Sequence, residues 1–363
     1  MATASLQTED PSLAPGDAGA PRSRFEREAT RRMITGAYGI SGMVVLPDGR
    51  VVTAACDGVV KVWHARRGCV RTLKAADSIL SVALLPGGRV VTGAGDPTSE
   101  EEGGCLQICD LNDGRRLRTL RGHGPYVVWC ILALADGRIL SGATDNKLMI
   151  WDPNDGRCLM TLQTHAPDFK CVVLCAAALP DGRVVSGHSG DHGNIKCWDV
   201  TDGRCLRTFT LSGTPYCIAV LSVNRVICGL ADSTLQVWDL TSGHCLRTLA
   251  GHSHDIQGVA LLPNGRVVSV DSPRPLSANK NATLKIWDLH GGRCLQTLTG
   301  AGTTAGLRCV VALPDGRISS GSADGALEVW FDWSQAMEKK MAAAVALQRT
   351  RNKYVVASIT KFL

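Results

Sequence analysis

Short segments in which apolar and polar residues alternate recur along most of the chain, and residues typical of tight turns separate them. In one representative unit the apolar segments cover residues 127–134, 139–141, 147–151 and 157–162. The turn residues between these segments are Asp136-Gly137, Asp145-Asn146 and Asp155-Gly156. Alternation with a period of two predicts β-strands, and Asp-Gly pairs between strands predict tight hairpins. Each unit is therefore predicted to form four short antiparallel strands.

The unit recurs seven times between about residues 37 and 333. Its third segment ends at one repeated position, occupied in turn by Trp63, Cys109, Trp151, Trp198, Trp238, Trp287 and Trp330. These residues are 40 to 49 positions apart, and four strands in a period of about 40–45 residues are typical of propeller blades. One small sheet cannot bury both of its faces, so the units should stack radially. The predicted fold is all-β: a seven-bladed β-propeller of four-stranded antiparallel blades, with a short C-terminal helix.

The third unit carries Gly122-His123, Ser141, Asp145 and Trp151, and this set resembles the WD-repeat family. The resemblance extends over about four-fifths of the chain. It implies that His123, Ser141, Asp145 and Trp151 form a buried hydrogen-bonded chain, because a buried carboxylate needs donors. Other units match in part, and the second has Cys109 in place of Trp. The partial sets are Thr53, Asp57 and Trp63; His165, Ser186 and Trp198; Asp232 and Trp238; His252, Ser269 and Trp287; and Ser320, Asp324 and Trp330.

The last unit ends near Trp330 without a fourth strand. Because an open propeller would present unpaired strand edges, a segment from elsewhere must close the ring. Residues 28–34 align with the missing strand and are the predicted closure, and residues 354–363 are the alternative. Residues 334–350 lack Gly and Pro and predict a helix. The predicted organisation is a disordered tail (1–24), the propeller (25–333), and a C-terminal helix with an extended tail (334–363).

The composition predicts a soluble protein of the cytoplasm or nucleus. Residues 1–24 have no apolar run, and the longest nearly apolar stretch, residues 171–180, is too short to span a membrane. Nine of the fifteen cysteines occupy two repeated positions, which predicts reduced thiols packed mostly in the core. No pair has C-x-x-C spacing, so we expect no metal and no cofactor. The first repeated position holds Cys69, Cys158, Cys205, Cys245 and Cys294, and the second holds Cys130, Cys175, Cys217 and Cys309.

The turns fall into two groups, which should open on opposite faces of the disc. The turns after the first and third strands are short and nearly identical, whereas the others vary and contain insertions at residues 97–103, 190–193 and 272–280. Variable loops on a rigid scaffold are where recognition usually resides, so partners are predicted to bind the variable face. One variable column near the start of each inner strand could line its centre: Ser41, Leu80, Trp129, Leu174, Tyr216, Gln257 and Arg308. The candidate partner-binding residues are Trp129, Tyr216, Gln257 and Arg308, with Tyr126 and His254 nearby, and Tyr38 and Asp255 as weaker candidates.

The net charge of +6 raises the question of nucleic-acid binding. However, one Arg recurs in each unit, usually beside a turn Asp such as Asp48 or Asp136, which predicts a mixed-sign ring rather than a basic stripe. No catalytic motif is present, so we expect no enzyme activity. The sequence favours a protein-interaction scaffold within a larger complex; a nucleic-acid-associated scaffold is the alternative. The repeated Gly-x-Cys-Leu-x-Thr-Leu phrase resembles WD-repeat subunits that handle ubiquitin, which suggests a ubiquitin-pathway receptor or adaptor.

Overall fold

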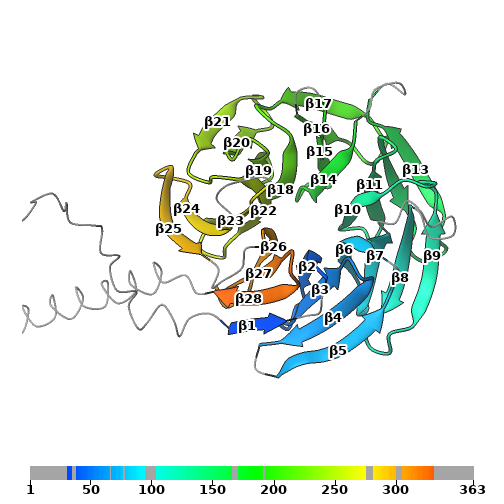
Figure 1. Cartoon of the computed structure of the whole chain (residues 1–363). Helices are drawn as coiled ribbons and strands as arrows, with labels where there is room; N and C mark the ends of the chain where they lie inside the picture. Colours follow the sequence, from blue (N-terminus) through cyan, green and yellow to red (C-terminus); the bar gives the residue numbers. More distant parts are fainter. Residues whose placement is uncertain are drawn as a thin grey trace, which may run out of the picture.

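The computed structural model describes residues 31–34, 38–65, 67–76, 78–94, 104–165, 171–190, 193–274, 281–299 and 305–330. The regular structure of these residues is entirely β, and it forms seven four-stranded antiparallel sheets. The sheets are arranged in a ring about a common axis, each beside the next (Figure 1). The predicted all-β, seven-bladed propeller is confirmed. The predicted tail (1–24), C-terminal helix and extended tail (334–363) lie outside the described residues.

Blades 1 to 6 are meanders whose first strand lies nearest the axis, and in blade 7 the innermost strand is β26, Leu307–Ala312 (Figure 1). Blade 1 comprises β2 (Ile40–Val45), β3 (Val51–Ala55), β4 (Val59–His64) and β5 (Gly68–Lys74). Blade 2 comprises β6 (Ile79–Leu85), β7 (Arg89–Ala94), β8 (Cys105–Asp110) and β9 (Arg116–Arg121). Blade 3 comprises β10 (Val128–Ala133), β11 (Ile139–Ala143), β12 (Lys147–Trp151) and β13 (Cys158–Gln163). Blade 4 comprises β14 (Val173–Ala178), β15 (Val184–His188), β16 (Asn194–Trp198) and β17 (Cys205–Thr210).

The remaining blades repeat this order. Blade 5 comprises β18 (Pro215–Ser222), β19 (Arg225–Leu230), β20 (Leu235–Asp239) and β21 (Cys245–Leu249). Blade 6 comprises β22 (Asp255–Leu261), β23 (Val267–Ser272), β24 (Thr283–Asp288) and β25 (Arg293–Thr299). Blade 7 comprises β26 (Leu307–Ala312), β27 (Ile318–Ser322), β28 (Ala326–Trp330) and, as its outermost strand, β1 (Arg31–Ile34).

The N-terminal segment closes the ring. Strand β1 pairs antiparallel with β28, with Arg31 opposite Val329 and Ile34 opposite Ala326. Met33 packs against the cluster that joins blades 7 and 1, which includes Trp63 and Leu327. Of the two predicted closures, the N-terminal one is therefore observed, and the described strand begins at Arg31.

Glycine in the second strand allows neighbouring blades to approach closely. A Cβ atom at Gly142 of β11 would lie 2.6 Å from Val173 Cγ1 of blade 4 and 2.8 Å from Cys130 Sγ. At Gly321 of β27, the corresponding atom would lie 2.7 Å from Ile40 Cγ2 of blade 1. Larger side chains at these positions would separate the blades and leave cavities in the core between them.

The prediction that the cysteines lie mostly in the core is wrong for one of the two repeated positions. The five cysteines of the first repeated position are exposed on outermost strands, as Cys69 is on β5 and Cys205 on β17. The blades diverge with distance from the axis, so both faces of an outermost strand reach solvent. The inner-strand cysteines do pack between blades, and burial raises the pKa of Cys130 and Cys217 to about 12. These inner thiols are protonated and inert at neutral pH.

Candidate functional site

The two faces of the disc differ in chemistry. The turns after the first and third strands share one face, while the turns after the second strands and the connections between blades share the other, the variable face. The predicted insertions follow β7, β15 and β23 on the variable face, and most of their residues lie outside the described part of the chain. Among the described residues, none forms a helix able to span a membrane.

On the opposite face, four of the seven repeated arginines are paired with turn aspartates: Arg50, Arg138, Arg183 and Arg317. Arg50 contacts Asp48 at 2.7 Å, and Arg138 contacts Asp136 at the same distance. The Arg183 side chain donates to Asp181 and lowers the pKa of that carboxyl. The charges therefore alternate around this face, as the sequence predicts, and they do not form a continuous basic surface.

Every innermost strand contains a register irregularity at the same place. In blade 3, Val128 lies opposite Ala143 and Cys130 lies opposite Gly142. Trp129 is therefore the extra residue, with no residue opposite it on β11. A bulge bends the strand and redirects the side chain of the extra residue. The seven residues at this position form the bulge column: Ser41, Leu80, Trp129, Leu174, Tyr216, Gln257 and Arg308. This is the column singled out from the sequence, which gave no sign of the bulges themselves.

The bulge column places several of the candidate residues at equivalent positions around the axis. Trp129 is 40% exposed and Arg308 is also exposed, whereas Tyr216 and Gln257 are half-buried. Arg308 lies 3.5 Å from Cys56 Sγ, and so connects blade 7 to the turn after the second strand of blade 1.

The other candidates divide between the surface and the interior. Tyr126 is 48% exposed and Tyr38 is 59% exposed, and both lie in connections that lead into inner strands. His254 is instead 7% exposed, and its Nε2 has no hydrogen-bond partner among the described residues. His254 therefore lies beneath the surface of the variable face rather than on it.

An ion pair that the sequence gave no reason to expect borders Tyr216. Asp255, at the start of β22, accepts from Arg274 Nε at 3.0 Å and from Arg274 Nη2 at 2.9 Å. Burial raises the pKa of Tyr216, and the Asp255 carboxylate raises it further. The Arg274 side chain is 65% exposed. A partner on the variable face would therefore find an aromatic ring beside a fixed guanidinium.

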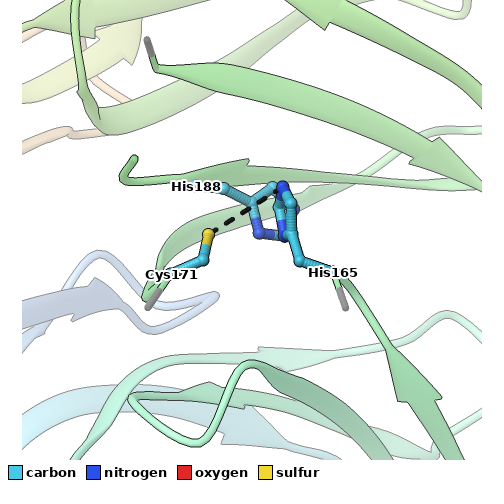
Figure 2. A group of neighbouring side chains, drawn as sticks. All are labelled: His165, Cys171 and His188. Carbon is cyan, nitrogen blue, oxygen red and sulfur yellow. Dashed lines mark hydrogen bonds between the residues drawn. The ribbon is translucent and has the colours of Figure 1, made fainter. Parts of the chain in front are cut away.

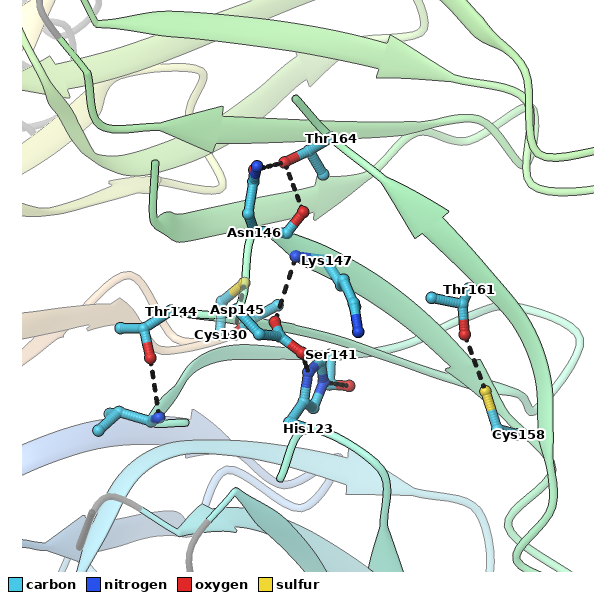
Figure 3. A network of polar contacts seen from close by, with 12 residues as sticks. His123, Cys130, Ser141, Thr144, Asp145, Asn146, Lys147, Cys158, Thr161 and Thr164 are labelled. Carbon is cyan, nitrogen blue, oxygen red and sulfur yellow. Dashed lines mark hydrogen bonds and ion pairs between the residues drawn. The ribbon is translucent and has the colours of Figure 1, made fainter. Parts of the chain in front are cut away.

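A buried polar chain in blade 3 holds the loop that enters this blade (Figure 3). His123 lies with Nδ1 2.8 Å from Asp145 Oδ2 and with Nε2 2.7 Å from Ser141 Oγ. Trp151 Nε1–H donates to the same Ser141 oxygen at 2.8 Å. These are the four side chains that the sequence grouped together. Their contacts join the entering loop, the second strand, the next turn and the third strand.

Blade 6 has an equally complete chain. His252 bonds Ser269 at 2.6 Å, and Trp287 donates to that same serine at 2.8 Å. The carboxylate is Asp271, 2.9 Å from His252 Nδ1, and sequence reasoning missed it. The sequence signal is an Asp two residues after the serine on the same strand, rather than in the following turn.

Blades 4 and 5 depart from the predicted sets. In blade 4, Ser186 accepts from Trp198 as expected, but its imidazole partner is His188 at 2.6 Å and not His165. In blade 5, Trp238 Nε1–H donates to Gln236 at 3.1 Å, whereas Asp232 accepts from the hydroxyls of Ser212 and Thr234. In blades 1 and 7 the indoles donate to Thr53 and Ser320, as the sequence predicts.

Blade 2 offers a test of the cost of an unpaired amide. Gln107 occupies the same strand position as Gln236, but Cys109 replaces the Trp, and neither amide atom of the buried Gln107 has a hydrogen-bond partner. We expect Gln107→Leu to raise the free energy of unfolding by about 1 kcal/mol, because it removes an unsatisfied polar group. The matched control Gln236→Leu should lower it by a similar amount, since Trp238 loses its acceptor. Urea unfolding would measure both, and equal losses in the two variants would contradict the argument.

Two further surfaces could in principle bind a partner. The outermost strands expose Leu159, Leu206 and Leu246 beside the exposed cysteines. Each of these leucines is 47–49% exposed. On the face opposite the variable face, a shallow apolar hollow is lined by residues such as Leu46, Leu262 and Leu313. Neither surface combines aromatic, amide and cationic groups as the bulge column does.

The comparisons with known proteins agree with the repeat. The family model described as "WD domain, G-beta repeat" matches residues 30–64, 114–152, 156–199, 243–288 and 292–330. The stretches between these matches include Cys109, which replaces the tryptophan in blade 2, and Gln236, which replaces the usual hydroxyl acceptor of the tryptophan in blade 5. No curated protein matches the sequence. The solved structure titled "Crystal structure of WD40 beta propeller domain of Doa1" is similar, with a TM-score of 0.68 and 22% identity over 84% of this chain and 96% of that chain. At this identity the similarity concerns the fold alone.

Proposed function

The chain belongs to the WD40-repeat family, and on this basis we propose that it is a non-catalytic scaffold that binds a protein or peptide on its variable face. WD40 propellers are generally protein-interaction scaffolds. The observation that carries the proposal is the bulge column, because the same bulge in each blade gives seven side chains of six types equivalent positions around the axis. A rigid ring that displays Trp, Tyr and Arg provides the residue types that most often anchor interfaces.

The chemistry of the ring favours a protein over a nucleic acid. Trp129 is exposed in blade 3, and Arg308 is the one cation of the bulge column. Binding to a phosphate backbone requires several Lys or Arg residues on one surface. The repeated arginines lie on the other face, where four of the seven pair with turn aspartates, as Arg317 does with Asp315 at 2.6 Å. A protein or peptide with an apolar anchor and an acidic group fits this surface best.

We further propose that the partner belongs to the ubiquitin pathway and that the chain works within a larger complex. The support is the repeated Gly-x-Cys-Leu-x-Thr-Leu phrase, which resembles ubiquitin-handling WD-repeat subunits. The proposed location is the cytoplasm or nucleus, because all fifteen cysteines are unpaired thiols, which favours a reducing compartment. Ubiquitin is therefore the first defined probe for the variable face.

The binding surface can be tested with two matched triple variants of the full chain. The ring variant is Trp129→Ala, Tyr216→Ala, Arg308→Ala, and the rim variant is Leu159→Ala, Leu206→Ala, Leu246→Ala. We expect the ring variant to lose about a hundredfold or more in affinity for ubiquitin, or for peptides selected on the wild type, because anchor residues carry most of the binding energy. The rim variant should bind as the wild type does. Calorimetric titration at two salt concentrations would measure this.

The outcomes separate the levels of the proposal. Selected peptides that bind the ring variant normally would remove the site from the variable face, and loss in the rim variant alone would move it to the outermost strands. Absence of ubiquitin binding, with selected peptides still lost in the ring variant, would leave a scaffold of another pathway. Binding only to RNA or DNA, weakening steeply with salt, would replace the protein-binding proposal.

A further inference from the structure

Three metal-ligand side chains converge at the edge of blade 4 on the variable face. His165 follows β13, Cys171 precedes β14, and His188 ends β15. One ligand atom from each lies within 4.8 Å of the other two. Figure 2 shows the Cys171 sulfur and the two imidazole rings turned toward one another. No metal was expected from the sequence, because no pair of cysteines has C-x-x-C spacing.

His188 is the side chain that this environment leaves incomplete. It is fully buried, and its Nε2 lies 2.6 Å from Ser186 Oγ, the atom that also accepts from Trp198. Its other ring nitrogen, Nδ1, is buried without a hydrogen-bond partner. In blades 3 and 6 a carboxylate occupies the corresponding place, with Asp145 and Asp271 within 2.9 Å of the imidazole Nδ1. Blade 4 has no such carboxylate at His188 among the described residues.

The serine contact gives His188 the arrangement of a metal ligand. Imidazole ligands nearly always donate the N–H of their second nitrogen to an oxygen, and this bond fixes the ring orientation and the tautomer. In the tautomer that carries its proton on Nε2, His188 donates to Ser186 and keeps a lone pair on Nδ1, the ring nitrogen without a hydrogen-bond partner. Ser186 is itself fixed by Trp198 at 2.7 Å. The orientation of the imidazole is therefore fixed by Ser186, and one of its nitrogens lies within 4.8 Å of the ligand atoms of the other two residues.

Cys171 and His165 supply the other two donors. Cys171 is 2% exposed, and its Sγ lies 4.0 Å from His165 Nε2 and 2.7 Å from the Ser189 carbonyl oxygen. The two imidazole rings are edge to face, with centroids 5.1 Å apart. The Nδ2 atom of Asn194 lies 3.3 Å from His165 Nε2. The Oδ1 atom of Asn194 is buried and has no hydrogen-bond partner. A second unsatisfied buried atom therefore adjoins the same cluster.

We propose that His165 Nε2, Cys171 Sγ and His188 Nδ1 bind a Zn²⁺ ion, with water or the Asn194 amide oxygen in the fourth position. Two imidazoles and one thiolate form a ligand set that suits zinc, at about 2.0–2.1 Å for nitrogen and about 2.3 Å for sulfur. In a tetrahedral site with these bond lengths, the sulfur and nitrogen are roughly 3.5 Å apart. The 4.0 Å between Cys171 Sγ and His165 Nε2 must shorten by about 0.5 Å, which a rotation of the partly exposed His165 side chain can supply. The thiolate supplies negative charge against the nearby Lys196 ammonium, which donates to the Thr164 carbonyl oxygen at 2.5 Å.

Bound zinc would act as a structural cross-link. It would join the connection between blades 3 and 4, through His165 and Cys171, to the second strand of blade 4, through His188. Metal binding to a folded site stabilises the fold, because the unfolded chain does not present the same three ligands together. The ion would therefore fix one loop of the variable face independently of whether a protein binds there.

Cobalt titration of the full, reduced, metal-free chain tests the site directly. We expect one equivalent of Co²⁺ to produce a thiolate-to-cobalt charge-transfer band with intense tetrahedral d–d bands, and Zn²⁺ to displace it. Cys171→Ser should abolish the charge-transfer band, and His165→Gln should weaken binding by at least about tenfold. Cys205→Ser removes an exposed thiol from the same blade and should bind as the wild type does. Zinc should raise the melting temperature of the wild type and of Cys205→Ser only.

Three outcomes of the cobalt titration would overturn the proposed zinc site. Absence of the charge-transfer band in the wild type, or a band that survives Cys171→Ser and disappears in Cys205→Ser, would overturn the proposal and assign any metal to surface thiols. His165→Gln provides a test if Cys171→Ser does not fold, because His165 is half-exposed. Unchanged cobalt affinity in a folded His165→Gln variant would also overturn it.

Discussion

Deletion of residues 1–36 is expected to lower the free energy of unfolding by roughly 4–6 kcal/mol. The estimate combines about 1 kcal/mol for each of the four strand residues with about 1.5 kcal/mol for the apolar contacts of Met33. These four residues are the only outermost strand that blade 7 has among the described residues. Without them β28 becomes an unpaired edge, so the truncated chain should also self-associate. Urea unfolding and sedimentation would measure the two effects.

Two controls separate closure from a general effect of truncation. Deletion of residues 1–24 removes only the predicted tail and leaves β1, so it should not change the unfolding curve. Met33→Asp in the full chain should reproduce part of the loss, because it places a charge against the cluster containing Trp63 and Leu327. Equal stability of the two truncated chains would show that β1 does not close the ring in solution.

Asp271→Ala is expected to lower the free energy of unfolding by about 3–5 kcal/mol. The carboxylate accepts from the Thr283 amide at 2.5 Å and from the Thr283 hydroxyl at 2.9 Å, in addition to its contact with His252. Removing the carboxylate leaves His252 and the Thr283 amide and hydroxyl without this acceptor, and each buried unsatisfied group costs about 1–3 kcal/mol. Asp48→Ala is the matched control: its carboxylate is 52% exposed and pairs only with Arg50, so we expect a change below about 1 kcal/mol. Equal losses would show that the buried chain contributes no more than a surface pair.

The same residue gives a pH dependence with a defined sign. Burial alone would raise the pKa of Asp271, but the hydrogen bonds from His252 and the Thr283 amide outweigh it and hold that pKa below 3.8. The folded pKa is therefore lower than the unfolded one, so ionised Asp271 stabilises the fold above pH 3.8 and loses this effect as the pH falls below that value. The stability difference between wild type and Asp271→Ala should shrink in acid. A difference that grows in acid would contradict the hydrogen-bonding argument.

The repeated pattern was enough to predict the blades, because each strand and turn is encoded locally. Alternation of apolar residues defines strands, and the Asp-Gly turns define hairpins. The polar chain of blade 3 could also be predicted, since all four side chains keep the spacing of the family resemblance. The contact between His188 and Ser186 could not be predicted, because both residues lie on the same strand. His165 has the spacing expected for the serine's partner, but its ring packs against the His188 ring instead.

The sequence by itself determined the number of blades, their four strands, the face that varies and the column of residues near the axis. Only the tertiary structure decided which side chains reach solvent or a common site. Cys69 and Cys205 repeat as faithfully as core residues do, yet they are exposed because blades diverge toward the perimeter. Trp129 is redirected by a bulge, and His165, Cys171 and His188 meet although loops and strands separate them. The physical reason is that local periodicity fixes hydrogen-bonding partners along a strand, whereas exposure and convergence depend on how the blades pack around the ring.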